Sequence, residues 1–414
     1  MLNVDVLSGS PTSEVNASGQ LNRPKNWWLD FGLFCLAVVV PSMAIFRKVG
    51  VVPMFGYVIA TILALYVLLR FILPAATRFL NTTICVGLVI AFFVAVIMLT
   101  YWVYPQILEH HGFKLLGIQF GVSDSNDAYM ATWKAMLAGK YPYYETSFLG
   151  NPISPMPGAL FIAFPFYLAG ATFLQNVFWL IVFWFGLSKY LGDLRVASVI
   201  FLTMVVACPE LTYCILQAGD YLTNSVYVLF PALLLLYFAD KHSESKWTLG
   251  FAVLFGFALS SRANYFLLVP IVFFALLRIR NFSYALKHMI VSMCVFALVT
   301  LPFYLYDPAH FSPLTTTNKL NLHGRFPHAA ECVFLMGCLI AAYLGFSLKK
   351  SFNIESVCAR MFFVQEFAIL SGFVLSFFAM GRVDLFYLHF TLLAMLFGVF
   401  ASAPRLFRSA LDLK

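Results

Sequence analysis

Two carboxylates stand close together in a stretch that is otherwise rich in alanine and aromatic residues. The stretch reads GVSDSNDAYMATWKAMLAGKYPYY, residues 121–144, and its acids are Asp124 and Asp127. A neighbouring serine can cap a helix here, and apolar residues recur at roughly helical spacing up to Gly139, where the helix should end. Acids are favoured at a helix start on electrostatic grounds alone, and a carboxylate is also a general base. The pair therefore has a structural and a catalytic interpretation.

Polar side chains also gather at other points between apolar segments. These residues are Asp220, Arg262, Asn264, Asp307, Lys319, His323, Arg325, Arg382 and Asp384. Histidines occur among them and in the pair His110–His111, but their spacing is not typical of a metal centre. We therefore predict no metal site and no other cofactor, with a divalent metal as the less favoured alternative.

The composition places these residues in a membrane protein. The chain has 414 residues, of which 62% are hydrophobic and 11% charged, whereas a soluble domain carries roughly 25% charged residues. Apolar runs of about 15–22 residues recur along it, which predicts spanning helices and a polytopic all-α fold in the lipid bilayer. The net charge of +8 comes without a basic run that interleaves aromatics, so nucleic acid is not an expected partner.

About twelve spanning helices are expected. Their ranges are 27–46, 51–70, 82–104, 173–190, 196–212, 221–239, 247–262, 265–278, 283–304, 328–347, 358–380 and 384–402. The apolar run 156–171 is short and rich in proline, so we interpret it as a juxtamembrane or re-entrant helix. Residues 1–26 are predicted to form a disordered cytosolic tail, and residues 27–414 a single transmembrane domain.

Basic residues between the spans set the expected orientation, because cytosolic loops carry an excess of Lys and Arg. With a cytosolic N-terminus, the inside residues are Arg23, Lys25, Arg70, Arg78, Lys189, Arg195, Lys241, Lys246, Arg278, Arg280, Lys349, Lys350, Arg360, Arg405, Arg408 and Lys414, and only Arg47–Lys48 conflicts. Both termini are then cytosolic, and the long loops 105–172 and 305–327 face out. Asp30, near the inner end of the first span, is expected to reach water.

The order of residues in the first long loop resembles that of the GT-C glycosyltransferases, which use polyprenyl-phosphate sugars. The order is Asp124, Tyr129, Ala135, Gly139 and Pro142–Tyr143, followed by GNPISPMPGALFIAFPFYLAG. The spacing from Asp124 to Gly139 is similar to that of the mannosyl- and aminoarabinose-type transferases. Residues 216–281 loosely resemble the central part of the mannosyl enzymes. The loop follows the third expected span, whereas many members place it after the first.

The resemblance implies a multi-spanning GT-C-like fold and an inverting sugar transfer. The donor would be a polyprenyl-phosphate-linked sugar, and the acceptor a glycan or glycolipid on the non-cytosolic side. Asp124 would be the base, with Asp127 as the alternative or as its hydrogen-bond partner. The candidates for binding the donor phosphate are Arg262 first, then Arg382, Arg325 and Lys319, and those for other substrate contacts are Tyr129, Tyr143, Asp220 and His323.

Two other classes of membrane protein stay open at this point. O-antigen polymerases and ligases also have many helices, but they depend on arginines in a large late outer loop, whereas the longest outer loop here comes early. A transporter or lipid flippase predicts inverted repeats and charges at mid-membrane, and neither is evident. The short tails and small loops fit a bacterial inner membrane, with the site facing the periplasm.

Overall fold

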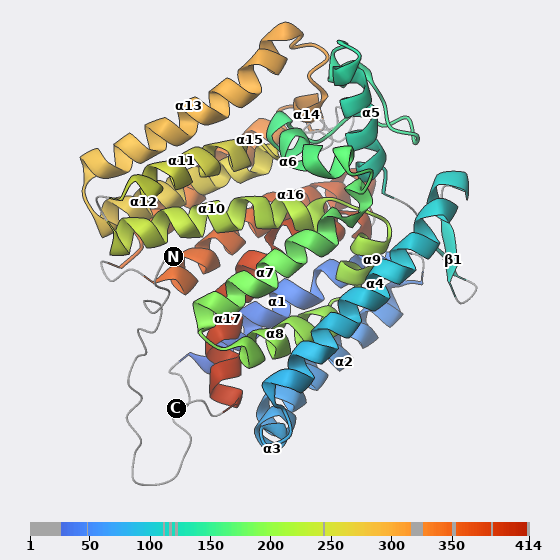
Figure 1. Ribbon diagram of the computed structural model, residues 1–414, viewed down its shortest axis with the longest axis vertical. Helices are drawn as coiled ribbons and strands as arrows, with labels where there is room; N and C mark the ends of the chain where they lie inside the picture. The colour runs from blue at the N-terminus through green and yellow to red at the C-terminus, as the bar shows by residue number, and fades with distance from the viewer. Residues whose placement is uncertain are drawn as a thin grey trace.

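A computed structural model describes residues 26–47, 49–110, 112–115, 118–120, 123–242, 245–315, 326–349, 353–381 and 384–411. Figure 1 shows a bundle of long helices, with α5, α6 and α14 together at one end. The expected tail over residues 1–25 and most of the second long loop, 316–325, lie outside the described residues. So do the basic residues Arg23, Lys25, Lys48, Lys350 and Lys414.

Helices make up nearly all of the described chain. The first half contains α1 (Trp27–Val39), η1 (Pro41–Arg47), α2 (Val51–Val67), the π-helical turn η2 (Leu68–Ile72), α3 (Leu73–Ala76), α4 (Thr82–His110), α5 (Ser125–Leu137), η3 (Pro142–Tyr144), α6 (Pro157–Leu168), η4 (Thr172–Leu174), α7 (Gln175–Leu191) and α8 (Leu194–Ala207). The second half contains α9 (Pro209–Leu216), α10 (Tyr221–Lys241), α11 (Lys246–Leu259), η5 (Ala263–Leu268), α12 (Val269–Ile279), α13 (Phe282–Tyr306), α14 (Ser312–Thr315), α15 (Ala329–Phe346), α16 (Ile354–Met380), η8 (Leu385–Thr391) and α17 (Leu392–Ala410).

One small hairpin departs from the all-α expectation. Strands β1 (Phe113–Leu115) and β2 (Ile118–Phe120) pair antiparallel in the first long loop, with Phe113 opposite Phe120. Among the described residues this is the one sheet. It follows the end of α4 and precedes α5, so it forms part of the connection that brings α5 to the end of the bundle.

Within the part of the chain that the structure describes, eight helices are long and apolar enough to cross a membrane. They are Trp27–Phe46, Val51–Ala76, Thr82–Ile107, Tyr221–Lys241, Phe282–Tyr306, Ala329–Phe346, Ile354–Met380 and Leu385–Ala410. Two helix pairs with sharp bends, Pro157–Leu168 with Thr172–Leu191 (114°) and Leu194–Ala207 with Pro209–Leu216 (83°), raise the number to ten if each pair is one span. The chain is therefore a multi-pass, predominantly α-helical membrane protein.

The count of spans is lower than the twelve expected because several apolar helices are short or bent. The expected spans 247–262 and 265–278 correspond to α11, which has 14 residues, and to the apolar helix Ala263–Ile279. Fourteen helical residues extend about 21 Å, which is less than the roughly 30 Å hydrocarbon core. Helix α6 covers most of the segment 156–171 and meets the next helix at a bend of 114°, a geometry that a broken span and a re-entrant helix share.

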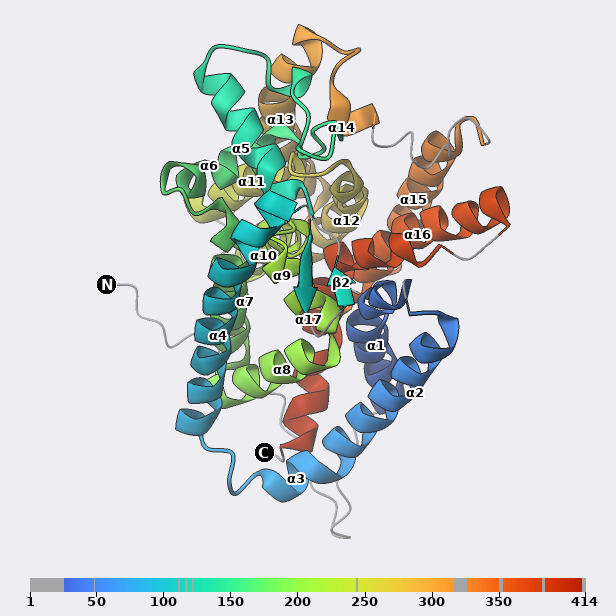
Figure 2. The same ribbon diagram turned by 90° about the vertical axis from the view of Figure 1, so that its right-hand side faces the viewer.

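The core of the bundle surrounds α17. Its span, Leu385–Ala410, is 83% buried, whereas the spans of α2, α13 and α15 are each 17% buried. Helix α17 packs against α1, α10 and α16, and Figure 2 shows it between α1 and α8 with α4 further out on one side and α2 on the other. The outer helices therefore present apolar side chains to lipid, and the inner ones hold the polar groups away from it.

The basic loops meet at one end of the bundle. The Arg280 guanidinium donates to the carbonyl oxygen of Ala239, at a distance of 2.8 Å, which joins the α12–α13 and α10–α11 loops. Arg408 donates to the carbonyl oxygen of Leu191, at 2.6 Å, which joins the end of α17 to the α7–α8 loop. Helices α5, α6 and α14 lie at the opposite end (Figure 1). From this separation the positive-inside tendency predicts that the basic end is cytosolic and that α5 is on the non-cytosolic face.

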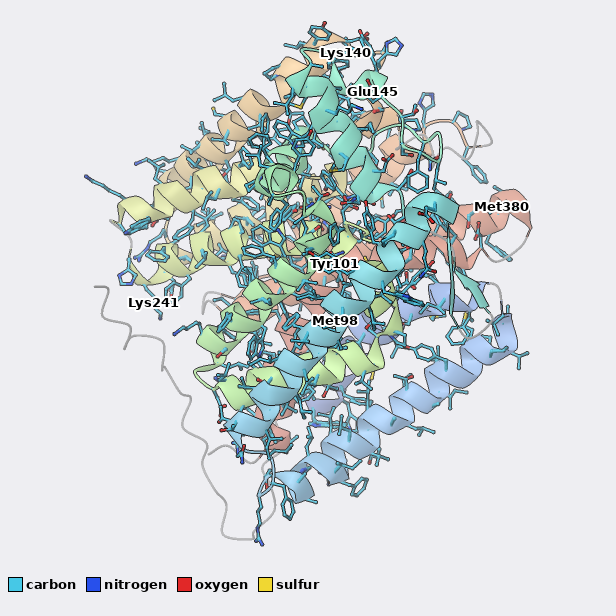
Figure 3. The ribbon with its side chains drawn as sticks, turned by 45° about the vertical axis from the view of Figure 1, so that its right-hand side comes forward. Met98, Tyr101, Lys140, Glu145, Lys241 and Met380 are labelled. Carbon is cyan, nitrogen blue, oxygen red and sulfur yellow. The ribbon has the colours of Figure 1, made fainter. Side chains whose placement is uncertain are left out.

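Cysteine labelling tests that orientation. Lys140→Cys should react with a membrane-impermeant maleimide in intact cells whose outer membrane has been permeabilised, whereas Lys241→Cys should react only after lysis. Both lysines are exposed, and Figure 3 shows them at well separated places on the molecule. Ser147 is less suitable because it is buried. The parent protein, with its native cysteines, is the background control. The reverse pattern would invert the topology and move α5 to the cytosol.

Candidate functional site

The start of α5 holds both acids of the first long loop. Asp124 occupies the N-cap position, but its side chain turns away from the helix. Its Oδ2 accepts hydrogen bonds from Ser147 Oγ (2.5 Å) and Asn151 Nδ2 (2.8 Å). Asp127 lies in the first turn, and its Oδ2 accepts the backbone N–H of Phe148 at 2.7 Å. Both acids therefore fix the segment 147–151 against the helix start.

The two hydrogen bonds to Asp124 orient its carboxylate but involve only one of its two oxygens. Both reach the same oxygen, and Oδ1 accepts no hydrogen bond from any residue that the structure describes. The side chain is half-buried. A carboxylate that is held on one oxygen and open on the other is suited to accept a proton from a bound hydroxyl group.

Helix α5 is held in place by α6, which in turn packs on the end of α11. It ends at Gly139, which has φ = +70° as a helix-ending glycine requires. Trp133 Nε1 donates to the carbonyl oxygen of Leu160 in α6, at 2.8 Å. The first turn of α6 in turn covers the end of α11, where Gly158 N donates to the carbonyl oxygen of Ser260 at 2.8 Å. A Cβ on Gly158 would lie within 2.8 Å of that same oxygen, so this close approach requires glycine.

A buried ion pair lies beneath α5. Asp220 immediately precedes α10, Arg262 follows α11, and the distance from Arg262 Nη2 to Asp220 Oδ1 is 2.5 Å. The side chains are 13% (Arg262) and 4% (Asp220) exposed. Asp220 Oδ2 accepts two further hydrogen bonds, from Tyr129 Oη at 3.0 Å and from Asn224 Nδ2 at 2.8 Å. Tyr129 belongs to α5, so this network joins three helices.

Burial and the charge of the partner shift the pKa values of Asp220 and Arg262 in opposite directions. Burial alone would raise the pKa of Asp220, but the charge and hydrogen bonds of Arg262, with the bond from Tyr129, hold that pKa below its usual 3.8. Burial likewise opposes the charge on Arg262, and the Asp220 carboxylate outweighs it and raises the pKa of the guanidinium. Both groups are therefore charged at neutral pH, and the pair is lost only as the pH falls through the lowered pKa of Asp220.

Two residues that the sequence analysis did not single out complete the cluster. The Arg262 guanidinium lies over the ring of Tyr221, 5.3 Å from its centroid. The Tyr221 hydroxyl is 3.2 Å from Nε2 of His389, which lies in η8 near the start of the last span. His389 falls within the predicted span 384–402. Because ionisable residues are costly in a bilayer, its presence there indicates a functional or paired side chain, and the sequence alone shows this.

Of the other predicted substrate-binding residues, the structure describes Tyr143. Tyr143 is buried away from the ion pair, and its hydroxyl donates to the carbonyl oxygen of Pro155 at 3.1 Å. Lys319, His323, Arg325 and Arg382 lie outside the described residues. Of the predicted set, the structure thus brings together Tyr129, Asp220 and Arg262, with Asp124 and Asp127 at the start of the helix that carries Tyr129.

A small cavity adjoins the ion pair. Its lining is Asn126, Tyr129, Thr172, Gln175, Asn176, Ala218, Gly219, Asp220 and Thr223. It has room for about one water molecule, so a sugar ring does not fit there. The residues that the structure describes contain no cluster of three or more His, Cys, Asp or Glu side chains that could hold a metal ion.

The fold and the site define a multi-pass helical membrane protein with an acid–arginine cluster beneath a short helix at one end. Comparison with family models, curated proteins and solved structures finds no match to this chain.

Proposed function

We propose that the protein is a membrane glycosyltransferase that moves a sugar from a polyprenyl-phosphate donor to a glycan or glycolipid acceptor. The observation that carries the proposal is helix α5, which begins with the oriented carboxylate of Asp124 and reaches the Asp220–Arg262 pair through Tyr129. A base and a cation held on one scaffold are the two groups that transfer from a phosphate leaving group requires.

The reaction is a single displacement with inversion at the anomeric carbon. The acceptor oxygen forms a bond to that carbon, and the bond from the carbon to the phosphate oxygen breaks with its electron pair. Asp124 accepts the proton of the acceptor hydroxyl, and the lipid phosphate departs as an anion. Asp127 keeps the 147–151 segment in place through Phe148, which makes it a positioning residue in this mechanism.

Arg262 is the cation proposed to receive the departing phosphate. Asp220 occupies only Nη2, and Nε has no hydrogen-bond partner among the described residues. In this proposal the phosphate shares the guanidinium, which is 13% exposed, with Asp220, and Asp220 holds it in position through Nη2. Guanidinium suits this role because it stays charged and presents several fixed N–H donors. Arg325, Arg382 and Lys319 remain candidates for further contacts with the donor.

The proposed location follows from the topology. The face that carries α5 and α6 would be periplasmic in a bacterial inner membrane, where the donor is presented after it has been flipped from the cytosol. The polyprenyl chain would stay in the bilayer beside the bundle, and the sugar phosphate would reach the α5 end.

Transfer by the purified protein is the direct test. The protein in lipid nanodiscs is incubated with a panel of radiolabelled polyprenyl-phosphate sugars and a mixture of envelope glycolipids from the producing cell. We expect one donor to yield free polyprenyl phosphate and a labelled acceptor. Movement of intact donor across the membrane of proteoliposomes, without cleavage, would favour a flippase and would contradict the proposal.

Substitution of Arg262 tests its contact with the donor. Arg262→Lys keeps the charge but loses the fork of donors, so we expect the KM for the donor to rise roughly tenfold, since a charge-assisted hydrogen bond contributes about 1.5–3 kcal/mol. Arg262→Ala should weaken donor use further. Arg280→Lys is the matched control, because Arg280 binds backbone carbonyls at the other end of the bundle. An unchanged donor KM together with a lower unfolding temperature would make Arg262 purely structural.

A further inference from the structure

Tyrosines gather where η3 meets the end of α13, near the segment that binds Asp124. Tyr141 is buried, and its hydroxyl donates to the carbonyl oxygen of Phe303 at 2.7 Å. Its ring stacks on Tyr306, with ring centroids 4.8 Å apart, and Tyr144 packs edge-on against it at 4.9 Å. Tyr306 and Tyr144 are 69% and 55% exposed. The buried ring of Tyr141 thus supports the exposed rings of Tyr144 and Tyr306.

A polar cluster holds the edge of this surface. Asp307 Oδ2 is 2.9 Å from the Tyr144 hydroxyl, which donates to it, and 2.8 Å from His310 Nδ1. The hydrogen bond from Tyr144, with those from His310, lowers the pKa of Asp307, so the carboxylate is charged at neutral pH. The charged carboxylate accepts a hydrogen bond from Nδ1, and this leaves Nε2 of the exposed imidazole to exchange a hydrogen bond with a ligand hydroxyl.

We propose that Tyr144, Tyr306 and His310, the tyrosine platform, bind a pyranose ring of the glycan acceptor. A pyranose has one apolar face of C–H groups that packs on an aromatic ring, and its hydroxyls lie around the rim. Here the exposed ring of Tyr306 offers the flat surface, and His310 Nε2 offers a hydrogen-bond partner for a sugar hydroxyl. The inference rests on the proposed function and names the class of acceptor that it requires.

The position of the platform relates it to the chemistry. Tyr144 stands three residues before Ser147, whose hydroxyl donates to Asp124. The same turn therefore carries the platform at one end and orients the carboxylate at the other. An acceptor that is anchored on Tyr306 would extend its next sugar along this turn towards Asp124.

Interfacial tyrosines are also common at the ends of membrane spans, and two features favour a sugar over lipid headgroups. The Tyr144 hydroxyl is already bonded within the protein, whereas a tyrosine of the interfacial belt uses its hydroxyl for the headgroup region. Charged residues, Lys140 and Glu145, lie at the same end of the molecule, as Figure 3 shows. Exposed aromatic rings among charged groups in water are typical of binding surfaces.

Direct binding tests the platform without relying on catalysis. The probes are mannotetraose, maltotetraose and chitotetraose, added to the purified protein in nanodiscs and followed by saturation-transfer NMR. We expect at least one probe to bind saturably, and Tyr306→Ala to weaken it about 3–10-fold, as the loss of an aromatic contact implies. Tyr306→Phe should bind within about twofold of the parent, because it keeps the ring. Tyr343→Ala is the matched control, since it removes an equally exposed ring from α15.

The outcomes separate this inference from the proposed function. Binding that depends on Tyr306, in a protein that transfers no sugar from any donor, would support the platform and contradict the transferase. If the protein transfers sugar and neither Tyr306→Ala nor His310→Ala changes the KM for the acceptor, the platform is overturned and the proposed transferase function stands. Absence of saturable binding to every probe would overturn the platform too, as would an effect of Tyr306→Ala confined to partition into lipid vesicles. Unfolding temperatures measured in parallel exclude variants that fail to fold.

Discussion

Asp124→Asn should lower kcat for sugar transfer by about 10²–10⁴-fold, which is the usual contribution of a general base. Asparagine has nearly the same size, and its side-chain oxygen can still accept from Ser147 and Asn151, so the turn that these residues form should persist. The proton acceptor alone is removed. The measurement is steady-state transfer with the active donor, together with equilibrium binding of that donor, which we expect to be unchanged.

Asp127→Asn is the matched control for this experiment. Among the described residues, Asp127 accepts only the backbone N–H of Phe148, and an asparagine oxygen can do the same. We therefore expect a decrease in kcat that is small beside that of Asp124→Asn. The opposite order, with Asp127→Asn inactive and Asp124→Asn near normal, would shift the base by one helical turn. Equal and large losses with a lower unfolding temperature would mean that both acids act by holding the loop.

The start and end of α5 are predictable because the signals are local. A serine and two acids stand at the start, and Gly139 adopts the left-handed conformation that ends the helix, but the N-cap residue is Asp124, without a side-chain capping hydrogen bond, rather than a serine. Capping and helical periodicity involve residues at most four positions apart, so they can be recognised without knowledge of the fold.

The number of spans is less predictable from the same sequence. Apolar composition identifies helices that avoid water, but it does not state where a helix bends. The pairs α6–α7 and α8–α9 turn by 114° and 83°, and α11 is too short to cross alone. Prolines such as Pro209 mark the first turns of helices after such bends. Whether a bent pair crosses the bilayer depends on the neighbours that satisfy its backbone groups.

The polar contacts of the candidate site are the least predictable part. Asp220 and Arg262 each stand at a helix end, which the sequence indicates, but they are 42 positions apart, and their pairing depends on how α10 packs against α11. Tyr129 joins them from a third helix. The position of His389 within an apolar segment indicates a polar role, but no local motif indicates that its partner is Tyr221. Side-chain partners of this kind are set by tertiary packing alone.

The expectation that Asp30 reaches water is wrong. Asp30 belongs to a buried ion cluster on which a large part of the stability of the fold should depend. Asp30 is buried and forms a two-pronged ion pair with Arg405 of α17, at 2.8 Å from Nε and 2.6 Å from Nη2. Arg405 Nη1 also contacts Glu355 at the start of α16, and Tyr190 of α7 donates to the other oxygen of Glu355 at 3.3 Å. One guanidinium thus serves two buried carboxylates on two further helices.

Arg405→Ala should therefore lower the free energy of unfolding by about 3–5 kcal/mol, the usual result of removing one partner of a buried ion pair. The side chains of Asp30 and Glu355 are 3% and 10% exposed, so neither can recover its hydration in place. Unfolding in mixed detergent micelles, followed by tryptophan fluorescence, measures the loss. Arg408→Ala is the matched control, because its guanidinium donates to a backbone carbonyl and leaves no carboxylate unpaired. Arg408→Ala should lower the free energy of unfolding by about 1–2 kcal/mol.

Removing the carboxylates as well should rescue the fold. If the loss in Arg405→Ala comes from two unpaired charges, then adding Asp30→Asn and Glu355→Gln to an Arg405→Met protein should restore much of the stability, because a neutral cluster carries no burial penalty for charge. The same carboxylate substitutions in the parent protein should destabilise it, since they leave Arg405 unpaired. Losses that simply add across these variants would show that the three side chains do not act as one unit, and that α1, α16 and α17 are held by apolar packing alone.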